Sequence, residues 1–454
     1  YMEKNEDSDM TSLATLSALE AALGIAAGEF SSQDLVSACV ERIAEMDEQI
    51  GAWTYFDVDY ALAQAKAADE HRQSGLPTGS LLGLPVAVKD IFDTADMPTE
   101  CGTPVYTGRT PTADSTVVAF LRQAGAIIMG KSVTTELAMY SPGKTRNPHD
   151  PERTPGGSSS GSAAAVASGM VPLAIGSQTA GSMIRPASFC GTVGFKPTHG
   201  RISLHGALML SRTLDTVGVF GRTVEDVALI GDALSLFDAA DPDMKPTAPL
   251  GLLQNVSTEP PVEPVFAFVK SPVWEKAGPD VKSGFEELAD ALGDKCDEVE
   301  LPEPFHHAID LHRTIMITDI AKNVGPLYDK DPTQLSEPLR EMVEAGRTVK
   351  AVDYANAFDL RKTLNAGLDQ IFSRYDAIVT PAATGAAPKT LNYTGNPIFC
   401  SLWTYCGVPT ISLPLLTSTD DMPIGVQLVG QRGYDGRLLR TAGWLTGTLS
   451  NMNE

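Results

Sequence analysis

The chain has 454 residues, of which 43% are hydrophobic and 20% are charged, a balance typical of a globular protein. Acidic residues outnumber basic ones by 57 to 34, and the net charge of −23 repels phosphate backbones, so no nucleic-acid partner is expected. No run of about 18 apolar residues occurs, so no membrane helix and no membrane partner are expected.

The predicted elements alternate along the chain. Residues 1–75 have the apolar spacing of helices, with a helix start indicated at residues 31–34. Strands are predicted at residues 84–89, 126–129, 171–175, 265–269, 377–380, 410–415 and 425–429. Helices are predicted at residues 115–123, 159–168, 223–236, 281–292, 351–372 and 436–446. This alternation predicts an α/β fold, in which one mixed, mostly parallel twisted sheet is covered by helices on both faces.

The domain organisation is predicted from the lack of any long Gly/Ser, Pro or charged linker. We expect one large domain formed by residues 76–454, with residues 1–75 as a helical segment packed on it. Residues 237–348 are more polar and richer in proline and charge, and they predict a variable excursion that forms a wall of the active site.

Cysteine usage and the first residues indicate the compartment. The six cysteines are scattered, and none lies in a CxxC or Cys/His spacing, which predicts reduced thiols and no bound metal. The first ten residues are acidic and polar, unlike a secretory signal peptide. A cytoplasmic protein is therefore expected.

Two segments match well-known motifs but stand in the wrong context. Residues 125–132 fit the phosphate-binding P-loop letter for letter, yet the segment between the glycines has the character of a strand, not of a flexible turn. Residues 157–161 fit the G-x-S-x-G nucleophile elbow, yet a loop at residues 153–155 precedes them instead of an apolar strand. We therefore expect neither a P-loop nor a nucleophile elbow.

A lysine and two glycine-rich serine loops carry the candidate chemistry. Lys89 ends an apolar run, Ser158 follows it by 69 residues, and Ser182 lies 24 residues further on. A serine hydroxyl is a weak nucleophile unless a base takes its proton, and an exposed lysine is mostly protonated at neutral pH. Because burial lowers the pKa of a lysine, one at the end of a buried strand can serve as that base.

These residues belong to a longer pattern that resembles the amidase signature family. The pattern covers most of the chain, with matching segments at residues 86–90, 147–148, 156–167, 178–182, 190–198, 407–409 and 423–430. The resemblance implies the amidase signature fold and a Ser-cisSer-Lys triad. By position in the motif, Ser182 would be the nucleophile, Ser158 the bridging serine after a cis peptide bond, and Lys89 the base.

The resemblance also implies the reaction. The backbone N–H groups of Thr179, Ala180, Gly181 and Ser182 would form the oxyanion hole, where small residues let a carbonyl approach closely. A small-molecule amide would be hydrolysed through an acyl-Ser182 intermediate, with no metal and no cofactor. Analogy with the family suggests a homodimer.

Gln178, Ala180 and Ile184 depart from the common family pattern, and Ile184 replaces an arginine. Arg185 follows directly, an arrangement that resembles the malonamidase-like branch, in which this arginine is thought to hold a substrate carboxylate. We expect Arg185 either to bind a carboxylate-bearing amide or to pair with an acidic side chain of the chain itself.

Two other functions stay open. The A subunit of a tRNA-dependent amidotransferase hydrolyses glutamine for a partner, but such subunits usually keep the arginine that Ile184 replaces. A catalytically silent scaffold of the same fold is disfavoured by the intact Lys89, Ser158 and Ser182. Asp215 also resembles a family motif and is expected to be structural.

Overall fold

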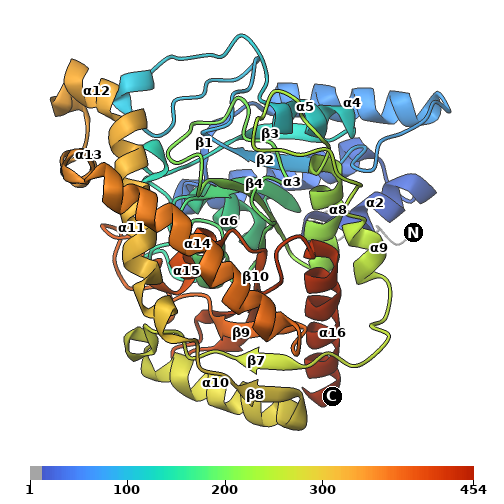
Figure 1. Cartoon of the computed structure of the whole chain (residues 1–454). Coiled ribbons are helices and arrows are strands. Elements are labelled where there is room, and N and C mark those ends of the chain that lie inside the picture. Colours follow the sequence, from blue (N-terminus) through green and yellow to red (C-terminus); the bar gives the residue numbers. More distant parts are fainter. Residues whose placement is uncertain (1–12, 454) are drawn as a thin grey trace.

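One eleven-stranded sheet runs through the computed structural model, which describes residues 13–453 (Figure 1). Across the sheet, the strands lie in the order β1-β3-β2-β4-β6-β5-β10-β11-β9-β7-β8. Their bounds are β1 Trp53–Phe56, β2 Pro85–Lys89, β3 Ile127–Ser132, β4 Leu173–Gln178, β5 Val193–Lys196, β6 Thr216–Gly221, β7 Phe266–Phe268, β8 Cys296–Glu298, β9 Ala377–Pro381, β10 Thr410–Thr417 and β11 Pro423–Val429. Strands β2 to β6 are buried along their whole length, so the middle of the sheet forms the core.

Six of the ten strand pairings are antiparallel and four are parallel. The predicted mixed sheet is confirmed, but its predicted parallel majority is wrong. The antiparallel strands β5 and β6 were missed because glycines such as Gly194 and Gly218 interrupt their apolar runs. In addition, β10 and β11 are joined by a short turn at residues 418–422, and a short turn connects antiparallel neighbours only.

Helices cover both faces of the sheet, as predicted. Successive residues of a strand point to opposite faces, and β5 shows which helix lies on each face. A Cβ atom at Gly194 would lie 2.6 Å from the Cβ of Ala187 in α7 (Ile184–Cys190). The ring of Phe195 instead approaches Gly231 in α8 (Val224–Leu234), on the other face.

Half of the α-helices outside the predicted set lie between β8 and β9. The remaining helical bounds are α2 Ala18–Ala27, α3 Ser32–Ile50, α4 Val58–Gln73, α5 Thr116–Gln123, α6 Ser160–Ala167, α9 Leu252–Val256, α10 Pro279–Leu292, α11 Ala308–Asn323, α12 Gly325–Lys330, α13 Glu337–Thr348, α14 Ala351–Phe372, α15 Ile398–Cys406 and α16 Asp435–Asn453. The predicted start of α3 is confirmed, because the Ser31 hydroxyl accepts a hydrogen bond from the Asp34 N–H at its N-terminus.

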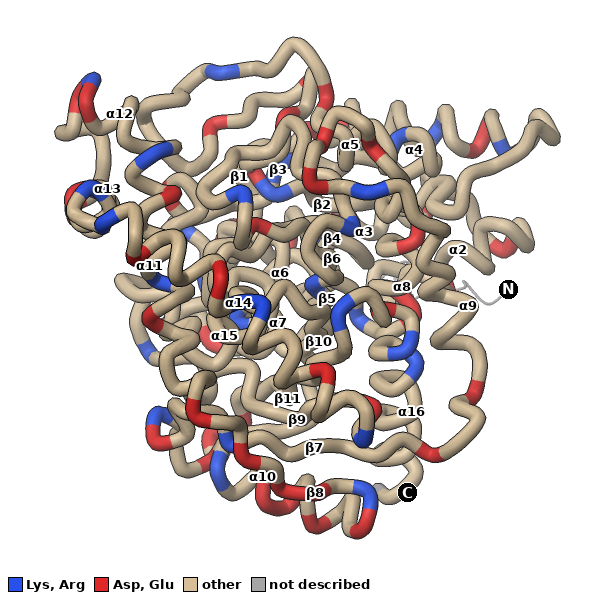
Figure 2. Tube along the Cα trace, in the orientation of Figure 1, with Lys and Arg blue, Asp and Glu red and all other residues tan. Residues whose placement is uncertain are grey.

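The two segments that the prediction sets apart, residues 1–75 and residues 237–348, both contribute strands to the common sheet. Within residues 1–75, β1 interrupts the helices and pairs antiparallel with β3. Within residues 237–348, β7 and β8 extend the sheet, and acidic residues gather along α10 and β8 there (Figure 2). The division into residues 1–75, residues 76–454 and an excursion at 237–348 stays a prediction.

The segment that matches the P-loop motif is strand β3. The Lys131 side chain is fully buried, lies 3.3 Å from a carboxylate oxygen of Asp90, and donates to the carbonyl oxygen of Phe92. It therefore serves the core of the sheet, and the rejection of a P-loop is confirmed.

Within residues 13–453, no helix is long and apolar enough to cross a membrane. The acidic first ten residues, which are unlike a signal peptide in composition, lie outside the described residues. The cytoplasmic location stays a prediction.

Candidate active site

Lys89 and Ser158 meet in the middle of the sheet. Lys89 ends β2, between β3 and β4, and its side chain is fully buried. Its Nζ donates to Ser158 Oγ at 2.7 Å and to Ser177 Oγ at 2.9 Å. Burial lowers the pKa of Lys89 to about 7, against a smaller opposing effect of Asp215. A sizeable fraction of this amine is therefore neutral at neutral pH and able to accept a proton.

Ser158 lies in the loop that leads into α6. The peptide bond between Gly157 and Ser158 is cis, and the Ser158 carbonyl oxygen accepts from the Thr135 N–H at 3.3 Å. Ser177, on β4, was missed by the sequence reasoning, because only the parallel pairing of β2 with β4 brings it to Lys89.

Ser182 lies in the loop between β4 and α7, where it is 8% exposed and lines a pocket. Its hydroxyl makes no hydrogen bond with any residue that the structure describes, so the expected contact with Ser158 is not formed here. The fold thus brings Lys89 and Ser158 into contact and leaves the Ser182 hydroxyl free toward the pocket.

The backbone around Ser182 is oriented with its N–H groups free and its carbonyl groups occupied. In the described part of the chain, no acceptor binds the N–H groups of Ala180, Gly181 or Ser182. By contrast, the Thr179 carbonyl accepts from His312, the Ala180 carbonyl from Thr404, and the Gly181 carbonyl from the Arg185 N–H. Free N–H groups beside a serine hydroxyl can stabilise an oxyanion.

Besides Thr404, two buried side chains hold this loop, Asp215 and His312. Asp215 accepts from Thr179 Oγ1 at 2.6 Å and from the N–H groups of Leu210 and Ser211. Burial raises the pKa of Asp215 to about 6. Its structural role, expected from the sequence, agrees with these contacts.

His312 is the second of these side chains, and its ring lies 2.9 Å from the Thr179 carbonyl. Burial lowers its pKa to about 4, so the ring is neutral at pH 7 and its Nε2 carries the proton that is donated. No sequence signal points to this residue, because a lone histidine on α11 belongs to no spacing motif.

Arg185 lies in α7, three residues after Ser182, and is 2% exposed. One nitrogen, Nη2, donates to the Gly157 carbonyl at 2.7 Å, whereas the buried Nε and Nη1 have no hydrogen-bond partner among residues 13–453. No carboxylate of the described chain pairs with this guanidinium, and burial lowers its pKa. The structural ion pair considered from the sequence is therefore absent.

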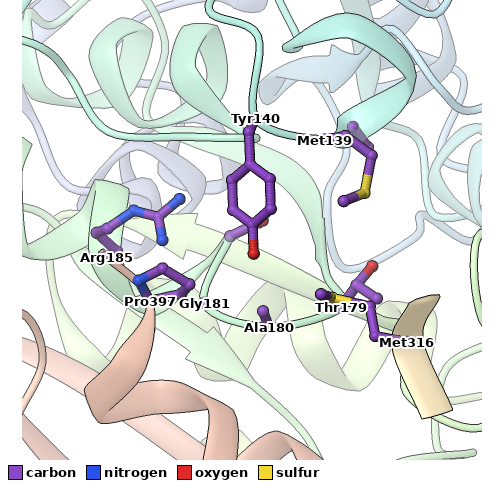
Figure 3. Close-up of a pocket in the computed structure, with 10 residues that line it drawn as sticks. Met139, Tyr140, Thr179, Ala180, Gly181, Arg185, Met316 and Pro397 are labelled. Carbon is purple, nitrogen blue, oxygen red and sulfur yellow. The ribbon is translucent and has the colours of Figure 1, made fainter. Parts of the chain in front are cut away.

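The pocket itself is small, about 20 Å³. Figure 3 shows the Arg185 guanidinium and the Tyr140 ring above the loop of Thr179, Ala180 and Gly181. Its other walls include Met139, Met316 and Pro397, none of which the sequence identified. No three His, Cys, Asp or Glu side chains within residues 13–453 are grouped to hold a metal ion, and the expected absence of metal and cofactor stays a prediction.

Comparison with known proteins identifies the family of this chain. The family model described as Amidase matches residues 34–439. The A subunit of the glutamyl-tRNA(Gln) amidotransferase of Symbiobacterium thermophilum is 33% identical over 458 residues, which cover 92% of this chain and 93% of that protein.

Solved structures agree with this match. A chain from a vestigial protein complex that reveals the evolutionary origins of an s-triazine catabolic enzyme has a TM-score of 0.88 and 29% identity, and the match covers 95% of this chain and 98% of that one. The native peptide amidase from Stenotrophomonas maltophilia has a TM-score of 0.85 and 26% identity, over 96% of this chain and 97% of that one. The chain belongs to the amidase family, and it is a hydrolase that acts on amide C–N bonds.

Proposed function

We propose that this enzyme hydrolyses a small amide that carries a carboxylate, with Ser182 as the nucleophile, Ser158 as the bridging serine and Lys89 as the base. The carboxylate preference rests on one observation: Arg185 is a buried cation beside Ser182, with two unpaired nitrogens and no acidic partner in the described chain. The hydrolytic mechanism is supported by the buried contact between Lys89 and Ser158.

The first step is acylation. The neutral Lys89 amine takes the Ser158 proton while Ser158 Oγ takes the proton of Ser182, whose Oγ bonds to the amide carbon. This requires the Ser182 hydroxyl to turn toward Ser158 when substrate binds, since catalytic hydrogen bonds often form only in the complex. The free N–H groups of Ala180 and Gly181 would stabilise the resulting oxyanion, with Thr179 held beside them.

The next steps complete the acylation and then restore the free enzyme. The C–N bond breaks as the leaving nitrogen takes a proton back through Ser158, and ammonia or an amine departs. Water then attacks the acyl-Ser182 ester and gives its proton to Ser158 and Lys89; when the C–O bond of the ester breaks, Ser182 Oγ takes this proton back along the same path, and the acid is released. In sum, an amide and one water give a carboxylic acid and ammonia or an amine.

The size of the site supports a small acyl group. A cavity of about 20 Å³ leaves little room beyond the reacting carbonyl unless the flexible Met139 and Met316 side chains shift. A guanidinium fork binds a carboxylate in a bidentate manner, so Arg185 would hold such a group next to the carbonyl that reacts.

The test is ammonia release by the purified chain across a panel of amides, with Ser182→Ala as the control. Malonamate and malonamide form the decisive pair, because they share one acyl frame and differ in the carboxylate; propionamide, benzamide, glutamine and biuret complete the panel. Malonamate preferred over malonamide, with both activities lost in Ser182→Ala, supports the proposal. A preference for neutral amides rejects the carboxylate part and keeps the triad.

A second candidate is a glutamine-hydrolysing component of a larger enzyme, which the match to the A subunit of a glutamyl-tRNA(Gln) amidotransferase favours. In that case, the isolated chain would release little ammonia from small amides, and glutamine turnover would rise when the partner proteins are added.

The mass of the purified chain in solution tests the expected homodimer, which a component of a larger complex need not form. The expectation that this chain has no nucleic-acid and no membrane partner stays a prediction.

The silent scaffold is the least supported interpretation, because Lys89 is held in a geometry suited to accepting a proton. A serine-directed fluorophosphonate that labels Ser182, but not the Ser182→Ala variant, rejects it.

A further inference from the structure

A second cavity, of about 520 Å³, lies away from the oxyanion loop. Its walls come from α11, from α14, and from the loops that follow β5 and β11. In Figure 1, α14 runs across the front of the molecule and α11 stands at its left side. Four basic side chains line it, Arg212, Lys322, Arg361 and Arg432, against two acidic ones, Asp243 and Asp319. This is the reverse of the chain as a whole, which has a net charge of −23.

Arg361 and Arg432 lack acidic partners. Arg361 Nη1 makes one long contact, 3.4 Å, with the Thr213 carbonyl, and its buried Nε and Nη2 have no hydrogen-bond partner among residues 13–453. Both side chains line the same cavity, and burial, with a smaller effect of Arg432, lowers the pKa of Arg361. Arg432 is exposed, and no ion pair of the described chain includes it.

The other charges of the cavity are compensated only in part. Arg212 Nε lies 2.6 Å from Asp243, so these two form an ion pair. Asp319 accepts from the hydroxyl groups of Ser211 and Tyr354 instead of from a cation. Four basic and two acidic side chains leave an excess of two positive charges in the cavity, and Arg361, Arg432 and the exposed Lys322 are the basic ones without an acidic partner in the described chain.

An apolar wall adjoins this pair of arginines. The rings of Tyr354 and Phe358 on α14 lie 5.2 Å apart, and Phe358 is 36% exposed. Met209, also 36% exposed, lies on the same cavity. Exposed aromatic faces beside two guanidinium groups suit a ligand that has both an anionic group and a planar ring.

We propose that this cavity binds a phosphate monoester that carries a planar ring, the chemistry of a nucleoside monophosphate. The exposed Arg432 would hold the phosphate with its guanidinium fork, the partly buried Arg361 would add a second positive charge to the same cavity, and Phe358 would pack against the ring. A phosphate monoester carries about −1.5 to −2 charges at pH 7, which matches two cations better than a single carboxylate does. The cavity is far larger than the pocket beside Ser182 and shares no lining residue with it.

The experiment is calorimetric titration of the full chain with adenosine monophosphate, inorganic phosphate and malonate. Adenosine monophosphate should bind more tightly than phosphate. Each of Arg361→Met and Arg432→Met should weaken its binding about tenfold or more, the value of one charge-assisted contact. Arg432 is exposed, so its replacement tests the site even if the Arg361 variant fails to fold, and thermal melting checks both.

Arg185→Met is the matched control, because it removes the buried guanidinium of the other pocket and should leave this binding unchanged. Equal binding by Arg432→Met and the unaltered chain would overturn the proposal, as would malonate binding as tightly as adenosine monophosphate, or no binding of either phosphate. Ammonia release by the Arg361 and Arg432 variants reports on the first pocket separately, so this proposal and the proposed function fail independently.

Discussion

Arg185 donates to the carbonyl oxygen of Gly157 over 2.7 Å, so the proposed carboxylate-binding side chain also holds the peptide that leads into Ser158. One nitrogen of the guanidinium is used for this contact, and two stay free inside the protein. Leaving buried donors unpaired costs about 1–3 kcal/mol each, a cost that a bound carboxylate would remove. Under the proposed function, the same residue would thus connect the acyl end of the substrate with the proton path.

The contact of Arg185 with Gly157 and its proposed contact with a substrate carboxylate together lead to a prediction for Arg185→Met. Turnover of malonamate, as kcat/KM, should fall about 100-fold or more, because a bidentate charged contact is lost. Turnover of malonamide should fall less, about tenfold or below, through the loosened Gly157 carbonyl alone. Arg185→Lys keeps the charge without the fork and should lie between the two. An equal loss on both amides would show that Arg185 only supports the fold of the site.

The two serine hydroxyl groups that accept hydrogen bonds from Lys89 allow a matched pair of variants. Ser158 and Ser177 both accept from its Nζ, at 2.7 and 2.9 Å, but only Ser158 is proposed to pass a proton to Ser182. Ser158→Ala should therefore lower kcat by about 100-fold to 10,000-fold, the usual value of a positioned proton carrier. Ser177→Ala should cost about tenfold or less, because it removes one hydrogen bond that orients Lys89. Similar losses in the two variants would contradict the assigned path.

The pH dependence of the rate follows from the lowered pKa of Lys89. A neutral amine is the active form, and its fraction rises as the pH passes the pKa, which burial lowers to about 7. We expect kcat/KM for malonamide, a substrate without charge in this range, to rise tenfold per pH unit below about pH 7 and to level off above it. A rate independent of pH between about pH 5.5 and 8.5 would mean that Lys89 is not the titrating base.

The sequence identified those site residues that lie in continuous motifs. Lys89, Ser158 and Ser182 each stand in a short segment whose glycines and apolar run indicate the local geometry; the fold brings Lys89 and Ser158 into contact and places Ser182 on the pocket, and their joint catalytic role stays a proposal. Ser177 and His312 could not be found in this way. Their contacts depend on which strands are neighbours and on where α11 packs, and neither is encoded in local spacing.

The fold shows the same limit. Alternating strands and helices predicted a two-sided α/β sheet, because periodicity reflects which side chains are buried. Whether two strands run parallel or antiparallel depends on the segments that connect them and on neighbours far apart in the chain. The periodicity of the sequence therefore did not predict the antiparallel strands β5 and β6. Likewise, the sequence could not show whether Arg185 has a carboxylate partner. That depends on which residues surround it in the fold, and no carboxylate of the described chain does so.

His312 leads to a prediction about stability at acid pH. Burial lowers its pKa from 6.5 to about 4, so the folded state resists protonation more than the unfolded state does. The stability that this ring contributes is present above about pH 6.5 and is lost as the pH falls toward 4, by about 3 kcal/mol. His312→Gln keeps an N–H donor for the Thr179 carbonyl but does not titrate. The urea midpoint of this variant should therefore fall less between pH 7 and 4 than that of the unaltered chain.

His199 provides the control for this measurement. Burial and the nearby Arg361 lower its pKa to about 4 as well, but its ring contacts the Arg212 carbonyl, away from the oxyanion loop. His199→Gln should also flatten the pH dependence, yet leave ammonia release at pH 7 unchanged. His312→Gln should lower kcat at pH 7, because the amide differs from the ring in shape and so shifts the Thr179 carbonyl and the N–H groups that follow it. An unaltered kcat in His312→Gln would show that the other contacts of this loop, among them those of Asp215 and Thr404, suffice to hold its orientation.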